Sequence, residues 1–153
     1  QLITSDELAF RLLDKDKNLQ IIDMRTPKEF KDMTFPRSKS FTVEGLFEKF
    51  ADKIINIKKK ENVFIANDEL TAKKAAIVAD KLGFNNIFVL KGGVNEFTKE
   101  ILNYNPNDVV AHNHNDATKR FRLKASIMIP KLIEESKNSI VPDKKPKRVL
   151  GGC

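Results

Sequence analysis

The chain is poor in residue types that often carry chemistry or covalent structure. Its one cysteine, Cys153, is the last residue, so no internal disulfide can form. Its two histidines, His112 and His114, are nearly adjacent. No apolar run approaches the roughly 20 residues that a membrane-spanning helix needs, and no signal peptide is visible. These absences exclude a disulfide-stabilised fold and a transmembrane helix within the given sequence.

What is present is an ordinary composition with an uneven distribution of charge. Hydrophobic residues make up 41% of the chain, enough for a single core, and charged residues make up 32%. Residues 1–105 carry 18 basic and 16 acidic side chains, whereas residues 106–153 carry 10 and 5. Most of the net charge of +7 therefore lies in the C-terminal third. This distribution argues against nucleic acid as a partner of the whole domain.

Hydrophobic periodicity predicts strands that alternate with helices. The expected strands cover residues 19–23, 40–43, 63–66 and 87–90. The expected helices cover residues 4–14, 27–33, 46–54, 69–82, 94–102 and 117–137. Strands separated by helices of about ten residues are typical of βαβ units. We therefore predict an α/β fold with a mainly parallel sheet.

Local signals refine the expected helices. Thr4-Ser5-Asp6-Glu7 has the spacing of a capping box, and Gly83 is a left-handed stop signal after the helix that ends near Leu82. Pro130 should kink the last helix or split it in two. Helical spacing predicts that the buried faces consist of Leu8, Phe10, Leu12 and Leu13; of Leu46, Phe47, Phe50 and Ile54; of Ala72, Ala75, Ala76 and Ala79; and of Phe121, Ala125, Met128 and Leu132.

Residues 62–76 form the stretch around which the chain is organised. They predict a buried strand, a tight polar loop and a helix that begins near Glu69, which is where α/β folds usually place their chemistry. The loop contains no Cys, Ser, His or Gly. Asn67 or Asp68 can cap the helix, and the carboxylates of Asp68 and Glu69 favour its N-terminus. An incoming anion would meet two like charges, and Thr71 has no visible base to activate it.

Four segments, in this order, resemble the rhodanese-like domain family. Residues 21–30, IIDMRTPKEF, are similar to the family's hydrophobic strand followed by D-x-R and x-P-x-E-F, and Phe35-Pro36 lies at its I-P-G-A turn, with Arg37 in place of glycine. Residues 82–87 and 90–93 resemble its L-G-[FY]-x-x-V and L-x-G-G segments. The resemblance covers roughly residues 2–104. It implies a three-layer α/β/α fold around a mainly parallel sheet.

The resemblance also implies an activity, sulfur transfer through a persulfide on a loop cysteine in the pattern C-x-x-G-x-R. The matching position is Ala66, or Ile65 if the loop is not shortened, and neither the cysteine nor the loop arginine is present. The vestigial active-loop positions are then Ala66, Asn67, Asp68, Glu69, Leu70 and Thr71. We therefore expect a non-catalytic binding or regulatory module without a cofactor; the alternative is a sulfurtransferase of rhodanese type.

Three further groups of residues could be mistaken for catalytic or metal sites. We expect Asp23 and Arg25 to form an ion pair that anchors neighbouring loops, because they follow a buried strand. Gly92 and Gly93 are expected to permit a turn with positive φ. His112, His114 and Asp116 could face one way, but a closed metal site needs about four ligands. We therefore predict a solvated loop and no metal site.

The chain divides into three expected parts: a rhodanese-like domain (1–105), a loop and helical extension (106–137) and a flexible basic tail (138–153) that ends in Gly-Gly-Cys. The tail's basic cluster either is solvated or contacts an anionic membrane surface. That cluster consists of Lys144, Lys145, Lys147 and Arg148.

Cys153 has three interpretations: an incidental free thiol, an attachment or dimerising point, and a persulfide carrier that would supply the missing nucleophile. The protein partner and the sulfur donor stay open. The location also stays open, between cytoplasmic and, if an anchor precedes Gln1, membrane-associated.

Overall fold

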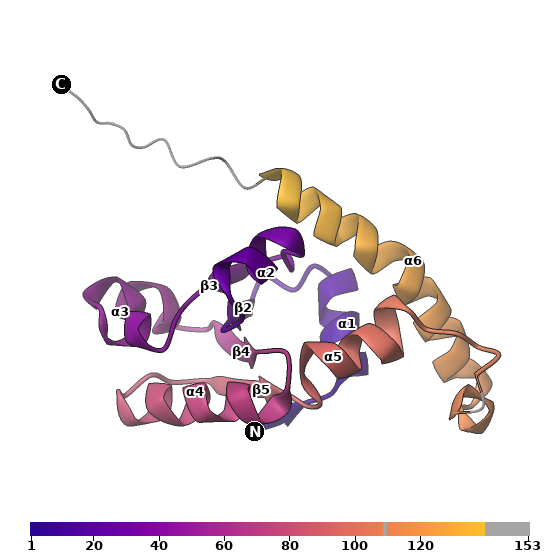
Figure 1. Ribbon diagram of the computed structural model, residues 1–153, viewed down its shortest axis with the longest axis horizontal. Helices are drawn as coiled ribbons and strands as arrows, with labels where there is room; N and C mark the ends of the chain where they lie inside the picture. The colour runs from indigo at the N-terminus through magenta and orange to yellow at the C-terminus, as the bar shows by residue number, and fades with distance from the viewer. Residues whose placement is uncertain (109, 140–153) are drawn as a thin grey trace.

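The computed structural model describes residues 1–108 and 110–139, and its centre is one five-stranded sheet (Figure 1). Neighbouring strands are parallel, in the order β1-β5-β4-β2-β3. The strands are β1 (Leu2–Ile3), β2 (Leu19–Asp23), β3 (Ser38–Ser40), β4 (Glu61–Ile65) and β5 (Ile87–Leu90). The predicted α/β fold with a parallel sheet is confirmed.

Helices connect these strands and extend the chain beyond the last of them. They are α1 (Ser5–Leu13), α2 (Pro27–Asp32), α3 (Lys49–Ile55), α4 (Glu69–Lys81), α5 (Gly93–Phe97) and α6 (Asp116–Ser139). Shorter turns are the 3-10 helices η1 (Glu44–Phe47) and η3 (Val110–Asn113) and the π-helical η2 (Thr98–Leu102). Thr4 and Glu7 form the predicted capping box of α1, and Gly83 has the predicted positive φ of 92°.

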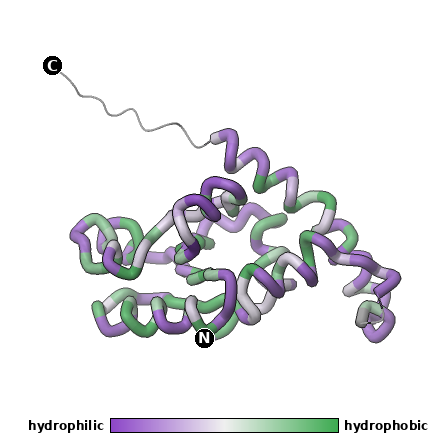
Figure 2. Tube along the Cα trace, viewed as in Figure 1, coloured by the Kyte–Doolittle hydropathy of each residue, from purple (hydrophilic) through white to green (hydrophobic). Residues whose placement is uncertain are grey.

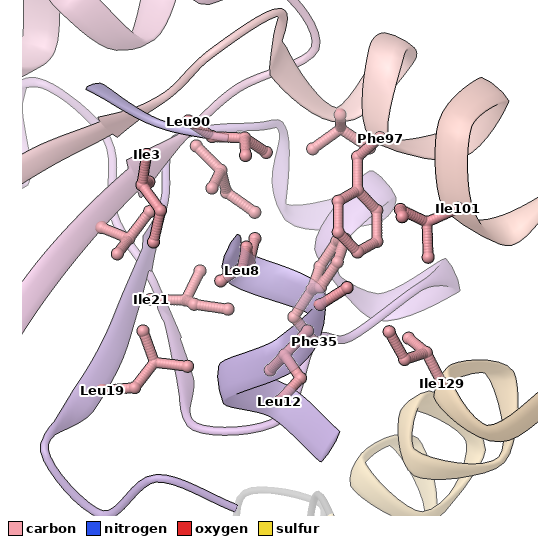
Figure 3. Close-up of a cluster of buried hydrophobic side chains, with 14 of the residues drawn as sticks. Ile3, Leu8, Leu12, Leu19, Ile21, Phe35, Leu90, Phe97, Ile101 and Ile129 are labelled. Carbon is pink, nitrogen blue, oxygen red and sulfur yellow. The ribbon is translucent and has the colours of Figure 1, made fainter. Parts of the chain in front are cut away.

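The two faces of the sheet are covered by different helices. On one face, α1, α5, η2 and α6 enclose a core that includes Leu8, Phe97 and Ile129 (Figure 3). On the other face, α3 and α4 cover a second core around Phe64 of the central strand. Helix α4 approaches the sheet closely through the predicted face of small residues, since Ala72, Ala75, Ala76 and Ala79 are all buried. The three-layer arrangement is thus confirmed.

Several predicted helix faces are wrong at their large aromatic or thioether residues. Phe10, Phe47 and Phe50 are 60%, 65% and 50% exposed, and Met128 is 41% exposed. Smaller or β-branched neighbours are buried in their place, namely Ala9, Ala51, Ile55 and Ile129. These segments have both exposed and buried apolar residues, and green is interspersed with purple along them in Figure 2, so the residue with the largest side chain does not mark the buried face.

Two further expectations are corrected by the backbone. The strand predicted at residues 40–43 is instead β3, at Ser38–Ser40, and its polar residues suit an edge strand that pairs only with β2. Helix α6 is not split at Pro130, which lies inside it, so of the two expected effects only the kink stays a prediction. Pro130 is exposed, so water can satisfy the carbonyl that loses its backbone donor. Among the described residues, no helix combines the length and the apolar character needed to cross a membrane.

Candidate functional site

The predicted vestigial loop lies at the carboxyl edge of the sheet, directly after the central strand β4. Strand β4 ends at Ile65 and α4 begins at Glu69, so residues 66–68 form the whole turn. Ala66 is buried and packs with the core under α3 and α4. Because β4 pairs with β2 and β5, the turns that follow those strands flank the loop on both sides.

The N-terminus of α4 is capped from within the loop. Asp68 is the N-cap, and its carboxylate accepts hydrogen bonds from the Thr71 backbone N–H at 2.8 Å and the Thr71 hydroxyl at 3.0 Å. The Thr71 backbone N–H, and then its hydroxyl, hold the pKa of Asp68 below its ordinary value. The Thr71 hydroxyl is thus held as a donor to the capping carboxylate.

The next carboxylate, Glu69, ties the loop to the turn after β5. Its Oε1 accepts a hydrogen bond from the Gly92 backbone N–H at 2.8 Å, and its Oε2 pairs with Lys73 Nζ at 2.8 Å. The Lys73 ammonium and then the Gly92 N–H lower the pKa of Glu69. The Gly92 N–H, which could otherwise donate to an anion at this edge, is therefore already hydrogen-bonded to Glu69.

The two glycines of that turn allow the loop and α5 to touch. Gly92 and Gly93 have φ values of 77° and 68°, which other residues adopt at a cost. A Cβ on Gly93 would lie 2.5 Å from the carbonyl oxygen of Asn67. The first turn of α5 then donates to the loop, from Val94 N to Ala66 O at 2.9 Å and from Asn95 N to Asn67 O at 3.0 Å.

On the other side, the loop is bound to the start of α2. The side-chain amide of Asn67 donates to Glu29 Oε2 at 2.7 Å. Glu29 also completes a capping box with Thr26, and the Asn67 amide followed by the Thr26 donors lowers the pKa of Glu29. The loop is therefore held by hydrogen bonds on both flanks.

Beneath it, Asp23 and Arg25 form the predicted ion pair, with Arg25 Nη2 at 2.7 Å from Asp23 Oδ2. The same nitrogen donates to the carbonyl of Met33 at 2.6 Å, and the guanidinium carbon lies 5.6 Å from the centroid of the Phe35 ring. Both charged side chains are buried. The pair thus joins the end of β2 to the segment after α2.

The remaining predicted residues lie away from this edge. His112 is in η3, and the His114 ring stacks at 6.2 Å on Tyr104. Asp116 is the first residue of α6. Within residues 1–108 and 110–139, no group of three metal-ligating side chains is close enough to hold an ion. Lys144, Lys145, Lys147, Arg148 and Cys153 lie outside the described residues.

Sequence reasoning missed several contacts that hold the loop. The Thr26-to-Glu29 capping box was readable, because its T-x-x-E spacing is the same as that of Thr4 to Glu7. The Asn67–Glu29 hydrogen bond and the Gly93 contact join residues that are distant in the chain, and no local pattern indicates them.

Comparison with known proteins gives matches over most of the described chain. A model of the rhodanese-like domain family matches residues 5–100. A curated tRNA uridine(34) hydroxylase from Pelagibacter ubique (strain HTCC1062) is 30% identical over 97 residues, which are 63% of this chain and 32% of that protein. The chain therefore spans about a third of the length of this relative.

Solved structures share the fold at low sequence identity. A rhodanese-like domain protein from Staphylococcus aureus is 23% identical with a TM-score of 0.52, covering 65% of this chain and 93% of that one. A single-domain sulfurtransferase from Saccharomyces cerevisiae is 26% identical with a TM-score of 0.50, covering 63% and 87% of the two chains.

Proposed function

The chain belongs to the rhodanese-like domain family, and from this premise we propose that it acts as a binding or regulatory module without a catalytic loop of its own. The loop that would carry a sulfur-accepting cysteine reads Ala66-Asn67-Asp68-Glu69-Leu70-Thr71. Nucleophilic sulfur transfer needs a thiolate, and this loop has no thiol to supply one.

One observation carries the proposal: side chains of the chain itself occupy the N-terminus of α4. An active loop of this kind would offer backbone N–H groups and the positive end of the helix dipole to an anion. Here Asp68 accepts the Thr71 N–H at the N-terminus of α4, and Glu69, the first residue of α4, places a second carboxylate there while it accepts the Gly92 N–H of the neighbouring turn. Both carboxylates are negatively charged at neutral pH, so they repel thiosulfate, persulfide and phosphate alike.

The closed loop also presents a surface on which a partner could bind. Leu70 lies two residues after the N-cap Asp68 and is 61% exposed, although it is apolar. Hydrogen bonds to α2, to the turn after β5 and to α5 keep the loop beneath it in one position. A fixed apolar residue beside two carboxylates suits recognition of a protein surface that offers an apolar pocket with a basic rim.

A sulfur-transfer assay tests the absence of catalysis. The chain and its Cys153→Ser variant are incubated with thiosulfate and cyanide, and thiocyanate formation is measured. We expect no turnover above background in either protein. Robust turnover by the Cys153→Ser variant would sink the non-catalytic proposal. Turnover that requires Cys153, together with a persulfide on Cys153 in the mass spectrum, would instead support the sulfur-carrier alternative.

A pair of matched variants tests the binding surface. Leu70 and Ile77 both lie on α4 and are 61% and 56% exposed. Leu70→Asp and Ile77→Asp therefore each add one charge at a similarly exposed apolar position. We expect Leu70→Asp to abolish crosslinking to the physiological partner and Ile77→Asp to preserve it. Equal crosslinking by both variants would show that the loop is not the binding surface.

The match to a tRNA uridine(34) hydroxylase supports a second candidate, a role beside a tRNA-modifying activity. Under this proposal the chain binds tRNA and slows its migration in a gel-shift assay. The affinity of the chain for tRNA should fall as the salt concentration rises. Retention of tRNA and of an unrelated RNA of equal length at the same concentration would reject it.

A further inference from the structure

A hollow lies at the amino edge of the sheet, opposite the carboxyl edge that carries the loop. It has a volume of about 470 Å³ and is bordered by the first residues of β2 and β3, by Lys60 just before β4, and by the last turn of α6. Figure 1 shows the C-terminal end of α6 beside α2, and Phe30 of α2 lines the same hollow. We call this hollow the amino-edge cavity.

The charge of the amino-edge cavity is of one sign. Arg37, Lys39 and Lys60 line it, and no carboxylate does. Among the described residues, none of the three cations makes an ion pair. Three cations around one hollow repel each other, so an anion bound among them would relieve that repulsion.

Two acidic residues near the cavity, Asp16 and Glu61, form ion pairs with an arginine that does not line it. Arg11 of α1 pairs with Asp16 through Nε at 2.8 Å and with Glu61 through Nη2 at 2.7 Å. Glu61 directly follows Lys60, yet its carboxylate is directed to Arg11. Glu135 lines an adjoining hollow with Arg37 without pairing with it. Among the described residues, the cations of the cavity therefore have acidic residues nearby but form no ion pair with them.

Backbone carbonyls position two of the cations. Arg37 Nη2 donates to the carbonyl of Lys15 at 3.0 Å, and Lys60 Nζ donates to the carbonyl of Lys17 at 2.6 Å. A carbonyl takes one donor and leaves the positive charge in place, so both groups keep donors for a ligand. The hydroxyls of Thr34 and Ser38 already donate to backbone carbonyls, so they have no proton to donate to an anion. An anion in the cavity would therefore be bound mainly by the cations.

We propose that the amino-edge cavity binds the phosphate group of a small phosphomonoester. A dianionic phosphate matches the charge of the three cations that line the cavity, and the arginine can meet two of its oxygens at once. The volume exceeds that of a phosphate alone, and the half-buried ring of Phe30 supplies an apolar surface for an organic group. The site is distinct from the loop at the carboxyl edge and does not depend on the proposed function of that loop.

Titration of the full chain with three probes, followed by amide NMR, tests this site. The probes are ribose 5-phosphate, inorganic phosphate and ribose. We expect saturable shifts at Ser38, Lys39 and Lys60 with ribose 5-phosphate, weaker saturation with phosphate and none with ribose. Short RNA and anionic vesicles form separate arms. Saturation by either of these without saturation by ribose 5-phosphate would overturn the proposal.

Charge-matched variants locate the binding. Arg37 has a φ of 59°, so Arg37→Asn removes the cation while keeping a residue that tolerates this backbone. We expect Arg37→Asn and Lys39→Met each to weaken ribose 5-phosphate binding about tenfold. Lys124→Met, on the exposed side of α6, removes the same charge and should leave the affinity unchanged. If Arg37→Asn does not fold, Lys39→Met still decides. Equal weakening by Lys124→Met would show only diffuse attraction to a basic protein and would reject the site.

Discussion

The guanidinium of Arg25 serves three partners at once, namely the Asp23 carboxylate, the Met33 carbonyl and the face of the Phe35 ring. Because Asp23 is fully buried, removing the arginine would leave a carboxylate without water and without a counter-charge. The pair therefore fixes the segment between β2 and β3 much more strongly than a surface ion pair could.

We predict that Arg25→Met lowers the free energy of unfolding by about 3–5 kcal/mol, as measured by urea denaturation. Arg120→Met serves as the control, since Arg120 is exposed on α6, and should change stability by less than about 0.5 kcal/mol. Restoration of most of the lost stability in the double variant Asp23→Leu/Arg25→Met would identify the buried charge as the cause.

A second prediction concerns Gly93, where backbone conformation and close contact coincide. Gly93→Ala would bring a Cβ to 2.5 Å from Asn67 O at a φ of 68°, so we expect a loss of about 1–3 kcal/mol in thermal or urea unfolding. Gly83→Ala has a φ of 92° but nothing within 4 Å of its Cβ, so it separates backbone strain from the clash. Equal losses in the two variants would show that the contact with the loop contributes nothing.

At the residue scale, prediction succeeded where the signal was local. Thr4 and Glu7, three residues apart, define a cap by their spacing alone, and Asp23 and Arg25 follow one buried strand. Gly93 was expected to serve a turn, but its contact with Asn67 depends on how β4 and β5 lie side by side. That second role follows from the packed sheet and has no signature in the sequence.

At the element scale, α6 shows how a helix can be predicted with the wrong face. The expected face was Phe121, Ala125, Met128 and Leu132, whereas the buried residues are Arg122, Ala125, Ile129 and Ile133. A charged residue is buried here because Asp6 holds Arg122 through two hydrogen bonds of 2.9 Å, and Glu100 lies 3.6 Å away. Those carboxylates become visible only once α1 and η2 lie against α6.

The corrected face of α6 gives a prediction with a control on the same helix. Ile129 is fully buried against the core in Figure 3, so Ile129→Ala should cost about 2–5 kcal/mol of unfolding free energy. Ile127 is 60% exposed, and Ile127→Ala should change it by less than about 0.5 kcal/mol. Similar losses in the two variants, measured by urea denaturation, would contradict the orientation of the helix.

At the scale of the whole molecule, the parallel sheet separates two chemically different edges. The carboxyl edge carries Asp68 and Glu69, whereas the amino edge gathers Arg37, Lys39 and Lys60. The sequence predicted the first edge, because one continuous stretch forms it. The second could not be predicted, because its cations come from separate segments that only the strand order β4-β2-β3 brings together.

The acidic groups of the carboxyl edge make the stability of the molecule depend on pH. The pKa values of Glu29, Asp68 and Glu69 are all lowered in the folded chain by hydrogen bonds or by Lys73. Such groups bind fewer protons when folded, so they stabilise the fold above their unfolded pKa of about 4 and lose that effect as the pH falls through the folded pKa.

We therefore predict that Tm is flat near neutral pH and falls steadily below about pH 4. Replacing the loop carboxylates by amides, in Asp68→Asn/Glu69→Gln, should reduce the steepness of that fall, as measured by thermal unfolding from neutral to acidic buffer. Asp32→Asn is a comparison outside the loop: the Lys28 ammonium also lowers the pKa of Asp32, so this single change should reduce the slope less than the double change in the loop. An unchanged slope in the loop variant would mean that these carboxylates are not linked to folding.

The contact between Arg122 and Asp6 joins residues 116 positions apart, and it has a consequence for synthesis of the chain. A nascent chain that has been synthesised through η2 but not yet through α6 still exposes the side of α1 and η2 that α6 later covers, including Leu8 and Ile101. Closing so long a loop is slow, and exposed apolar surface favours aggregation in the meantime. The apolar surface of α1 and η2 is therefore protected from aggregation only after α6 has been synthesised and has packed against it.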